Sequence, residues 1–202
     1  MSHSETYSRP STHAESYMDE TVKMARAMDC AGIEKLADHL DILRGKCGRL
    51  FIAGLGGSAA NASHAANDFR KLCGIDAYCL SDNVAELTAR ANDEGWKTIF
   101  DGALHAHLPK PHDALLILSV GGGTDEVSVP LVAVIEYANM LGMMIFGIVG
   151  RDGGHTKKYA TCCVIVPTVD PSRVTPHTEA FQSVILHCLV SHPKLQRNST
   201  KW

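Results

Sequence analysis

The stretch that decides the fold is residues 54–69, GLGGSAANASHAANDF. It follows a short apolar run at 49–54, RLFIAG, and after its glycines it has the composition of a helix. A buried strand that turns through glycines into a helix is typical of a parallel α/β sheet. His64 and Asp68 stand four residues apart in the helical part, so their side chains share one face. The turn can either bind a ligand or simply connect the strand to a well-capped helix.

The same alternation continues along the chain. Further apolar runs of strand length occur at 77–81, 114–120, 143–150 and 162–167. Helical stretches lie between or after them, at 58–72, 83–91, 94–106, 125–141 and 176–191. Alternating strands and helices predict a three-layer α/β/α sandwich around a five-stranded parallel sheet.

The two ends of the chain suggest how the domain is bounded. Residues 1–12 are predicted to be a disordered tail, 13–192 a single domain and 193–202 a C-terminal tail. Within the domain, 13–47 has the apolar spacing of two amphipathic helices that break near 29–32. Helices that precede the first strand need a surface to pack against, so we expect them to support oligomerisation.

Composition excludes several classes of protein. A net charge of −3 over 202 residues gives no basic surface for nucleic acid. No apolar run is long enough to span a membrane, and the polar start is unlike a signal peptide. The seven cysteines are odd in number and form no C-x-x-C pair, which indicates free thiols in a reducing compartment. We expect a cytoplasmic protein without nucleic-acid or membrane partners.

Two glycine loops are the candidate binding sites. The first, 54–58, leads into a helix whose free amides favour an anion, and Ser58 can cap the helix or donate to a phosphate oxygen. It also matches a relaxed G-x-G-x-x-[GA], a weak sign of a dinucleotide site. The second, 119–124, has three consecutive glycines before Thr124, a predicted helix N-cap, and can form an anion nest. Asp125 and Glu126, expected in the first turn of that helix, would oppose a phosphate unless directed outward.

These motifs resemble those of the sugar-isomerase (SIS) domain family, and most of all the phosphoheptose isomerases, which convert sedoheptulose 7-phosphate to a heptose 7-phosphate. GLGGSAANASHAAND at 54–68 resembles the family's G-N-G-G-S-A-A-x-A-x-H-x-x-x-E, and ANDEGW at 91–96 resembles its A-N-D-x-G-[YF]. LLILSVGGGTDEV at 115–127 takes the place of its S-T-S-G-N-S loop. GIVGRDGG at 147–154 resembles A-L-T-G-x-x-G-G. The order and spacing hold over roughly residues 14–192, and the resemblance implies a flavodoxin-like sheet.

The resemblance also implies a set of site residues. The sugar phosphate would be bound by residues of both glycine loops and of the ANDEGW segment: Leu55, Gly56, Gly57, Ser58, Asn92, Asp93, Ser119, Val120, Gly121 and Thr124. One zinc ion per subunit would be held by His64, Asp68, Glu179 and His187. The subunits would form a homotetramer with active sites at their interfaces.

The reaction implied is an aldose–ketose isomerisation through an enediol. A base removes a proton from the carbon beside the carbonyl and an acid returns one to its neighbour. Either Asp68 or Glu179 would be the base, with His187 as the acid. Glu179 and His187 are eight positions apart, about 12 Å along a helix, so both reach one metal only if Glu179 lies at a bent helix start or reaches across.

The chain departs from the family pattern at several of these positions. Asp68 replaces Glu, Glu179 replaces Gln, Thr124 replaces Ser, and Val120 and Gly121 remove two loop hydroxyls. The alternative is therefore a non-catalytic SIS protein that binds a sugar phosphate or another protein as a regulator. A dinucleotide-dependent oxidoreductase is disfavoured because no convincing ribose-binding acid is present.

Overall fold

The computed structural model describes residues 11–199 and contains a five-stranded, wholly parallel sheet. Its strand order, β2-β1-β3-β4-β5, is that of a doubly wound flavodoxin-like sheet. The predicted fold class is confirmed. The strands are β1 (Leu50–Gly54), β2 (Ala77–Cys79), β3 (Ala114–Ser119), β4 (Met144–Val149) and β5 (Cys162–Ile165).

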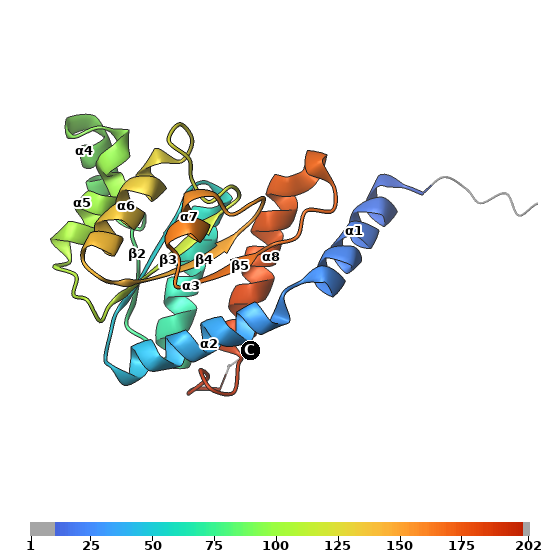
Figure 1. Cartoon of the computed structure of the whole chain (residues 1–202), viewed down its shortest axis with the longest axis horizontal. Helices are drawn as coiled ribbons and strands as arrows, with labels where there is room; N and C mark the ends of the chain where they lie inside the picture. The colour runs from blue at the N-terminus through green and yellow to red at the C-terminus, as the bar shows by residue number, and fades with distance from the viewer. Residues whose placement is uncertain (1–10, 200–202) are drawn as a thin grey trace, which may run out of the picture.

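Helices cover both faces of the sheet (Figure 1). One face packs against α2 (Cys30–Gly45), α3 (Gly57–Cys73) and α8 (Val174–Val190). The other packs against α5 (Ile99–Ala106) and α6 (Val129–Met140), flanked by α4 (Val84–Asp93) and α7 (Gly154–Tyr159). Alternate strand residues serve the two cores: Ile52 and Leu116 face the first, whereas Phe51 and Leu115 face the second. Short 3₁₀ turns, Trp96–Thr98 and Pro171–Arg173, precede α5 and α8.

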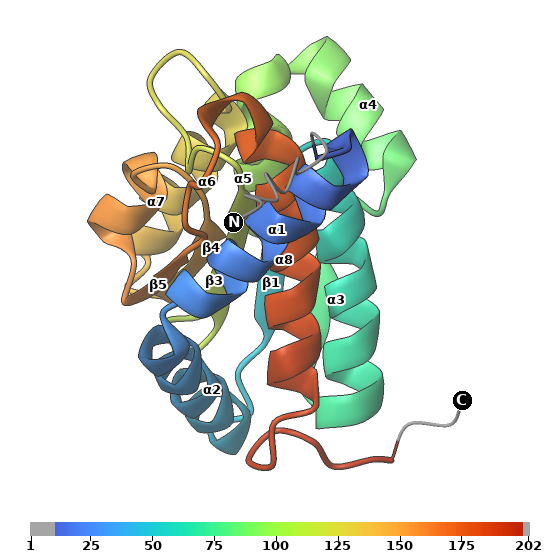
Figure 2. The ribbon, with the colours of Figure 1, turned by 90° about the vertical axis from the view of Figure 1, so that its right-hand side faces the viewer.

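Helix α1 (His13–Ala27) extends away from the sheet in Figure 1 and crosses α8 in Figure 2. Thr12 caps it through a capping box with Glu15, while residues 1–10 of the predicted tail lie outside the described residues. Met24 is buried, but Met18 and Val22 are exposed. The helix therefore has apolar side chains that this subunit leaves uncovered.

The segment that follows α8 packs against α2 and α3. Leu195 is fully buried, and the Arg44 guanidinium donates hydrogen bonds to the backbone oxygens of Leu195 (2.7 Å) and Cys73 (2.9 Å). These contacts join the chain end to α2 and α3. Residues 200–202 of the predicted C-terminal tail lie outside the described part.

The prediction that a helix starts at 125 after an N-cap at Thr124 is wrong. Helix α6 begins at Val129, and the Thr124 hydroxyl instead accepts a hydrogen bond from the Val127 amide (3.0 Å) within a turn. Pro130 explains the difference, because proline fits the first turn of a helix but would clash with the carbonyl of Glu126 if the helix began earlier. Asp125 and Glu126 thus lie in an exposed loop, outside the helix.

Candidate active site

A cavity of about 700 Å³ opens where β1 and β3 end. These adjacent strands run to helices on opposite faces of the sheet, which makes their carboxyl ends the switch point where open α/β sheets bind ligands. Six of the predicted substrate-binding residues line the cavity: Leu55, Ser58, Ser119, Val120, Gly121 and Thr124. Residues of both glycine loops therefore face one space.

The first loop enters α3 through two glycines, and the second of them lies against Glu179 of α8. Gly56 has a φ of +61° and forms the turn into α3, and Gly57 follows it as the first helical residue. A Cβ atom on Gly57 would lie 2.5 Å from Oε2 of Glu179, so any larger residue here would displace that carboxylate. Gly56 and Gly57 do not line the cavity themselves. They bring Glu179 of α8 against the positive end of α3.

The second loop is hydrogen bonded to the start of α7, the helix that follows β4. The backbone oxygen of Gly122 accepts hydrogen bonds from the hydroxyl and the amide of Thr156 (2.7 and 2.9 Å). Gly123 accepts from the amide of His155 (2.9 Å), and the Ser119 hydroxyl accepts from the amide of Gly122 (3.0 Å). Because the carbonyls of the second loop accept hydrogen bonds from α7, the shape of this cavity wall depends on the position of α7 as well as on the loop itself.

His64, Asp68 and His187 form a cluster on the outer side of α3 and α8, which lie side by side in Figure 2. Nε2 of His64 lies 3.2 Å from Nε2 of His187 and 3.0 Å from Oδ2 of Asp68. Nε2 of His187 lies 3.9 Å from the same oxygen. The side chains of the two histidines are more than half exposed, whereas that of Asp68 is 15% exposed.

The cluster has the chemistry of a metal site. Two imidazole nitrogens and a carboxylate oxygen lie within 4.8 Å of one another, and three protein ligands with a further open position suit a catalytic zinc ion. Three of the four predicted metal ligands therefore come together. Glu179 lies outside the cluster, next to Gly57.

Polar contacts between α3 and α8 determine where the cluster forms. The amide group of Asn61 donates to the backbone oxygen of Glu179 (2.8 Å) and to Oε1 of Gln182 (3.1 Å). Gln182 is fully buried and also donates to the backbone oxygen of Ile148 in β4 (3.4 Å). This network holds the two helices in register with each other and with the sheet, and so brings His64 and His187 together.

Asn92 and Asp93 lie apart from both features. They end α4, are exposed, and their side chains hydrogen bond to each other (2.7 Å). Neither lines the cavity of this subunit.

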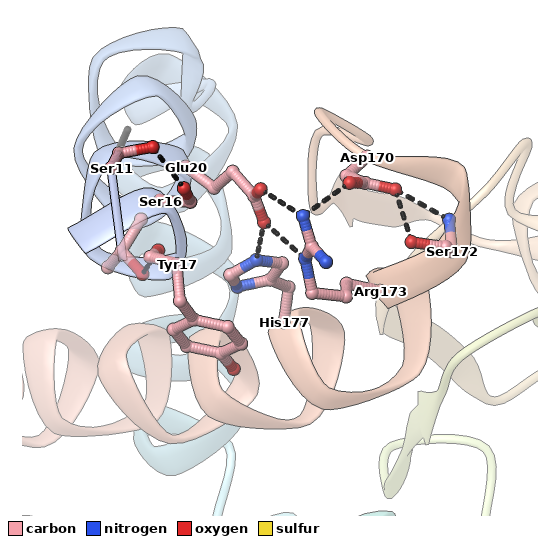
Figure 3. Close-up of polar contacts among 9 residues, drawn as sticks. Ser11, Ser16, Tyr17, Glu20, Asp170, Ser172, Arg173 and His177 are labelled. Atoms are coloured by element: carbon pink, nitrogen blue, oxygen red, sulfur yellow. Dashed lines mark hydrogen bonds and ion pairs between the residues drawn. The ribbon is translucent and has the colours of Figure 1, made fainter. Parts of the chain in front are cut away.

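The start of α8 is anchored by α1 through a polar cluster (Figure 3). Glu20 accepts hydrogen bonds from Nε and Nη2 of Arg173 (2.8 and 2.5 Å) and lies 2.8 Å from Nε2 of the buried His177. The ring of Tyr17 stacks on His177 at 4.3 Å. Hydrogen bonds from Arg173 and then from His177 lower the pKa of Glu20 to about 2. Thr175, which lines the cavity, lies between Arg173 and His177 in the sequence, in the first turn of α8.

Comparison with known proteins identifies the family. No family model matches the chain. A phosphoheptose isomerase from Trichlorobacter lovleyi is 35% identical over 165 residues, covering 79% of this chain and 79% of the relative. Another, from Helicobacter pylori strain P12, is 32% identical over 152 residues, covering 72% and 76%. The chain belongs to the phosphoheptose isomerase family. The fold of the phosphoheptose isomerase from Neisseria gonorrhoeae matches with a TM-score of 0.76 at 21% identity, over 88% of this chain and 95% of that one.

Six residues that line the cavity are absent from the predicted site: Arg151, Asp152, Thr175, Gly123, Val127 and Ser128. The first two follow β4, which pairs with β3. The rule that ligands lie beyond the carboxyl ends of parallel strands points to residues 150–154, but no member of that segment was among the predicted site residues. Thr175 could not be found in that way, because its position depends on how α8 packs. No helix in the described part of the chain is long and apolar enough to cross a membrane.

Proposed function

We propose that this protein interconverts sedoheptulose 7-phosphate and an aldoheptose 7-phosphate. The observation that carries the proposal is made in a member of the phosphoheptose isomerase family: a cavity with serine, threonine and arginine side chains lies at the ends of β1 and β3, and a His–Asp–His cluster lies further along α3, against α8. The cavity would bind the phosphate, and the cluster would lie near the carbons that react. Family membership favours this function over the regulatory alternative.

The spacing of the two features suits a seven-carbon sugar phosphate. Ser58 lines the cavity and His64 belongs to the cluster, and the two residues are six positions apart, about 9 Å along the axis of α3. In an extended 7-phosphate, seven bonds separate C2 from phosphorus, or about 8 Å at roughly 1.2 Å per bond. The separation of the two features along the helix axis is therefore similar to the length of this part of the substrate.

The chain offers an acid and a base for the proton transfer. A carboxylate, Asp68 or Glu179, would take the proton from C1 of the ketose, and the enediol would receive a proton at C2 to give the aldose. His187 would be the acid partner. Asp68 and His187 are within 3.9 Å of each other, so both could face the same two carbons.

We further propose one Zn²⁺ per subunit, held by His64, Asp68 and His187. Two neutral imidazoles and a carboxylate are ligands that zinc prefers. When bound, the ion would polarise the substrate carbonyl and favour the enediolate. Glu179 could join as a fourth ligand only by turning away from Gly57.

A homotetramer with active sites at its interfaces accounts for the features that one subunit leaves incomplete. The two histidines of the cluster are more than half exposed, and Asn92 and Asp93 are exposed and do not line the cavity of their own subunit. In the proposed assembly, these two residues complete the site of a neighbour.

The experiment compares the wild-type protein with His187→Ala by elemental analysis and by a coupled assay on sedoheptulose 7-phosphate. We expect the wild type to hold about one zinc per subunit and His187→Ala to lose metal and at least about 100-fold in turnover. Chelation should abolish the wild-type activity, and added Zn²⁺ should restore it.

The matched control is His112→Ala, which removes an exposed histidine from the loop before β3. It should retain both metal and turnover. A metal-free wild-type protein without turnover would contradict the proposal and support the binding-only alternative.

A further inference from the structure

We propose that Arg151 is the charged member of the phosphate subsite and makes the site selective for phosphorylated sugars. The inference rests on the proposed function for the nature of the ligand. Arg151 lies outside the two glycine loops, just after β4. The inference rests on two observations: the residue lines the cavity, and its guanidinium group has no hydrogen-bond or ion-pair partner among the described residues.

The backbone holds Arg151 beside the second glycine loop. Before it, the amide of Gly150 donates to the backbone oxygen of Ser119 (3.2 Å). After it, α7 is bonded to Gly122 and Gly123 through the contacts described above. Arg151 lies between these two attachments, so its Cα cannot move independently of the cavity wall.

The guanidinium group of Arg151 is available for a ligand. It makes no hydrogen bond or ion pair with any residue between 11 and 199. The neighbouring carboxylate is already engaged, because Asp152 accepts a hydrogen bond from the amide of Gly154 (3.1 Å). Of the residues that line the cavity, all of them described, Arg151 is the only cationic one.

A phosphate ester in this cavity needs such a group. It carries close to two negative charges at neutral pH, and the other side-chain donors that line the cavity, such as Ser58, Ser119 and Thr124, are neutral hydroxyls. Val120 and Gly121 supply no hydroxyl at all. Arginine binds phosphate through two parallel hydrogen bonds, which compensates for missing neutral donors.

The stem of Arg151 passes close to Gly121. A Cβ atom at position 121 would contact only Arg151, whose Cδ would be 3.8 Å away. The stem of the arginine thus passes over the residue that lacks a side chain. Arg151 also has a φ of +52°, in the left-handed region that favours glycine, and a non-glycine residue held there is a sign of function.

The test measures the affinity for inorganic phosphate by calorimetry, which does not depend on turnover. Arg151→Gln should weaken phosphate binding by about tenfold or more, and Arg151→Lys by less. Lys157→Gln is the control, since it removes one positive charge from an exposed position on α7 outside the cavity. It should bind phosphate as the wild type does. If Arg151→Gln does not fold, Arg151→Asn can be measured in its place, because asparagine adopts the left-handed backbone more readily than glutamine does.

In the coupled assay, Arg151→Gln should raise the KM for sedoheptulose 7-phosphate at least about tenfold while leaving kcat within a few-fold. Unchanged phosphate affinity in Arg151→Gln and Arg151→Asn, or no phosphate binding by the wild type, would overturn the inference. If the wild type binds phosphate through Arg151 but does not isomerise the sugar, the proposed function fails and the subsite stands.

Discussion

At the scale of single residues, Gly122 and Gly142 illustrate two different reasons why a position favours glycine. Both have a left-handed backbone, with φ of +74° and +72°. A Cβ on Gly122 would lie 1.9 Å from the backbone oxygen of Gly153, whereas a Cβ on Gly142 would meet nothing within 4 Å. Only Gly122 is also required for the close approach of two loops.

We expect Gly142→Ala to lower the free energy of unfolding by about 1 kcal/mol, the cost of the left-handed backbone alone. Gly122→Ala should cost about 3 kcal/mol or more, because the two loops must also separate. Urea unfolding of both variants measures the difference. Equal losses would show that the loop contact does not contribute to stability.

Some of the site was predictable at this scale and some was not. The spacing of His64 and Asp68 places them on one helical face regardless of the rest of the fold. That His187 joins them depends on the packing of α3 against α8, which local spacing does not determine; the family resemblance supplied it. The position of Glu179 depends on where α8 begins, and so the sequence could not place it.

At the scale of elements, the contact between α1 and α8 should respond to acid. The pKa of Glu20 is lowered from 4.5 to about 2 by Arg173 and His177, so the charged form stabilises the folded contact. This contribution is fully present above about pH 4.5 and is lost as the pH falls toward 2. Hydrogen exchange should show that the amides of α1 lose protection over this range.

Glu20→Gln should lower the protection of α1 at neutral pH and remove most of its change between pH 4.5 and 2. Asp19→Asn is the control, because it removes an exposed carboxylate from the same helix. It should behave as the wild type does. Protection of α1 in Glu20→Gln equal to that of the wild type at neutral pH would contradict the prediction.

The boundaries of elements were predicted unevenly. The five strands were found because each lies in a short apolar run, and β1 and β3 are buried on both faces along their whole length. The start of α6 was missed because the acidic loop after the glycines has the composition of a first helical turn, whereas the true first turn is marked only by Pro130. Helix α7 is six residues long and polar, so it has too little periodicity to be recognised.

At the scale of the whole molecule, α1 is the element for which the proposed assembly makes the clearest prediction. Met18 is 61% exposed and Val22 47% exposed on a helix that stands away from the sheet. If α1 packs against other subunits, Met18→Lys should shift a tetramer to smaller species in sedimentation experiments, because burying the lysine would be costly.

Met140→Lys is the matched control, since Met140 is 72% exposed at the end of α6, on the other face of the sheet. It should leave the sedimentation of the protein unchanged. If Met18→Lys also sediments as the wild type does, α1 is not part of the interface.

The His–Asp–His cluster joins parts of the chain that are 123 positions apart. The segment between its two histidines contains β2, β3, β4 and β5. An ion bound there would act as a cross-link around most of the sheet and would restrict the unfolded chain as a long closed loop does. Loss of the ion would then lower resistance to heat and proteolysis as well as activity, so scarcity of metal would also shorten the lifetime of the protein.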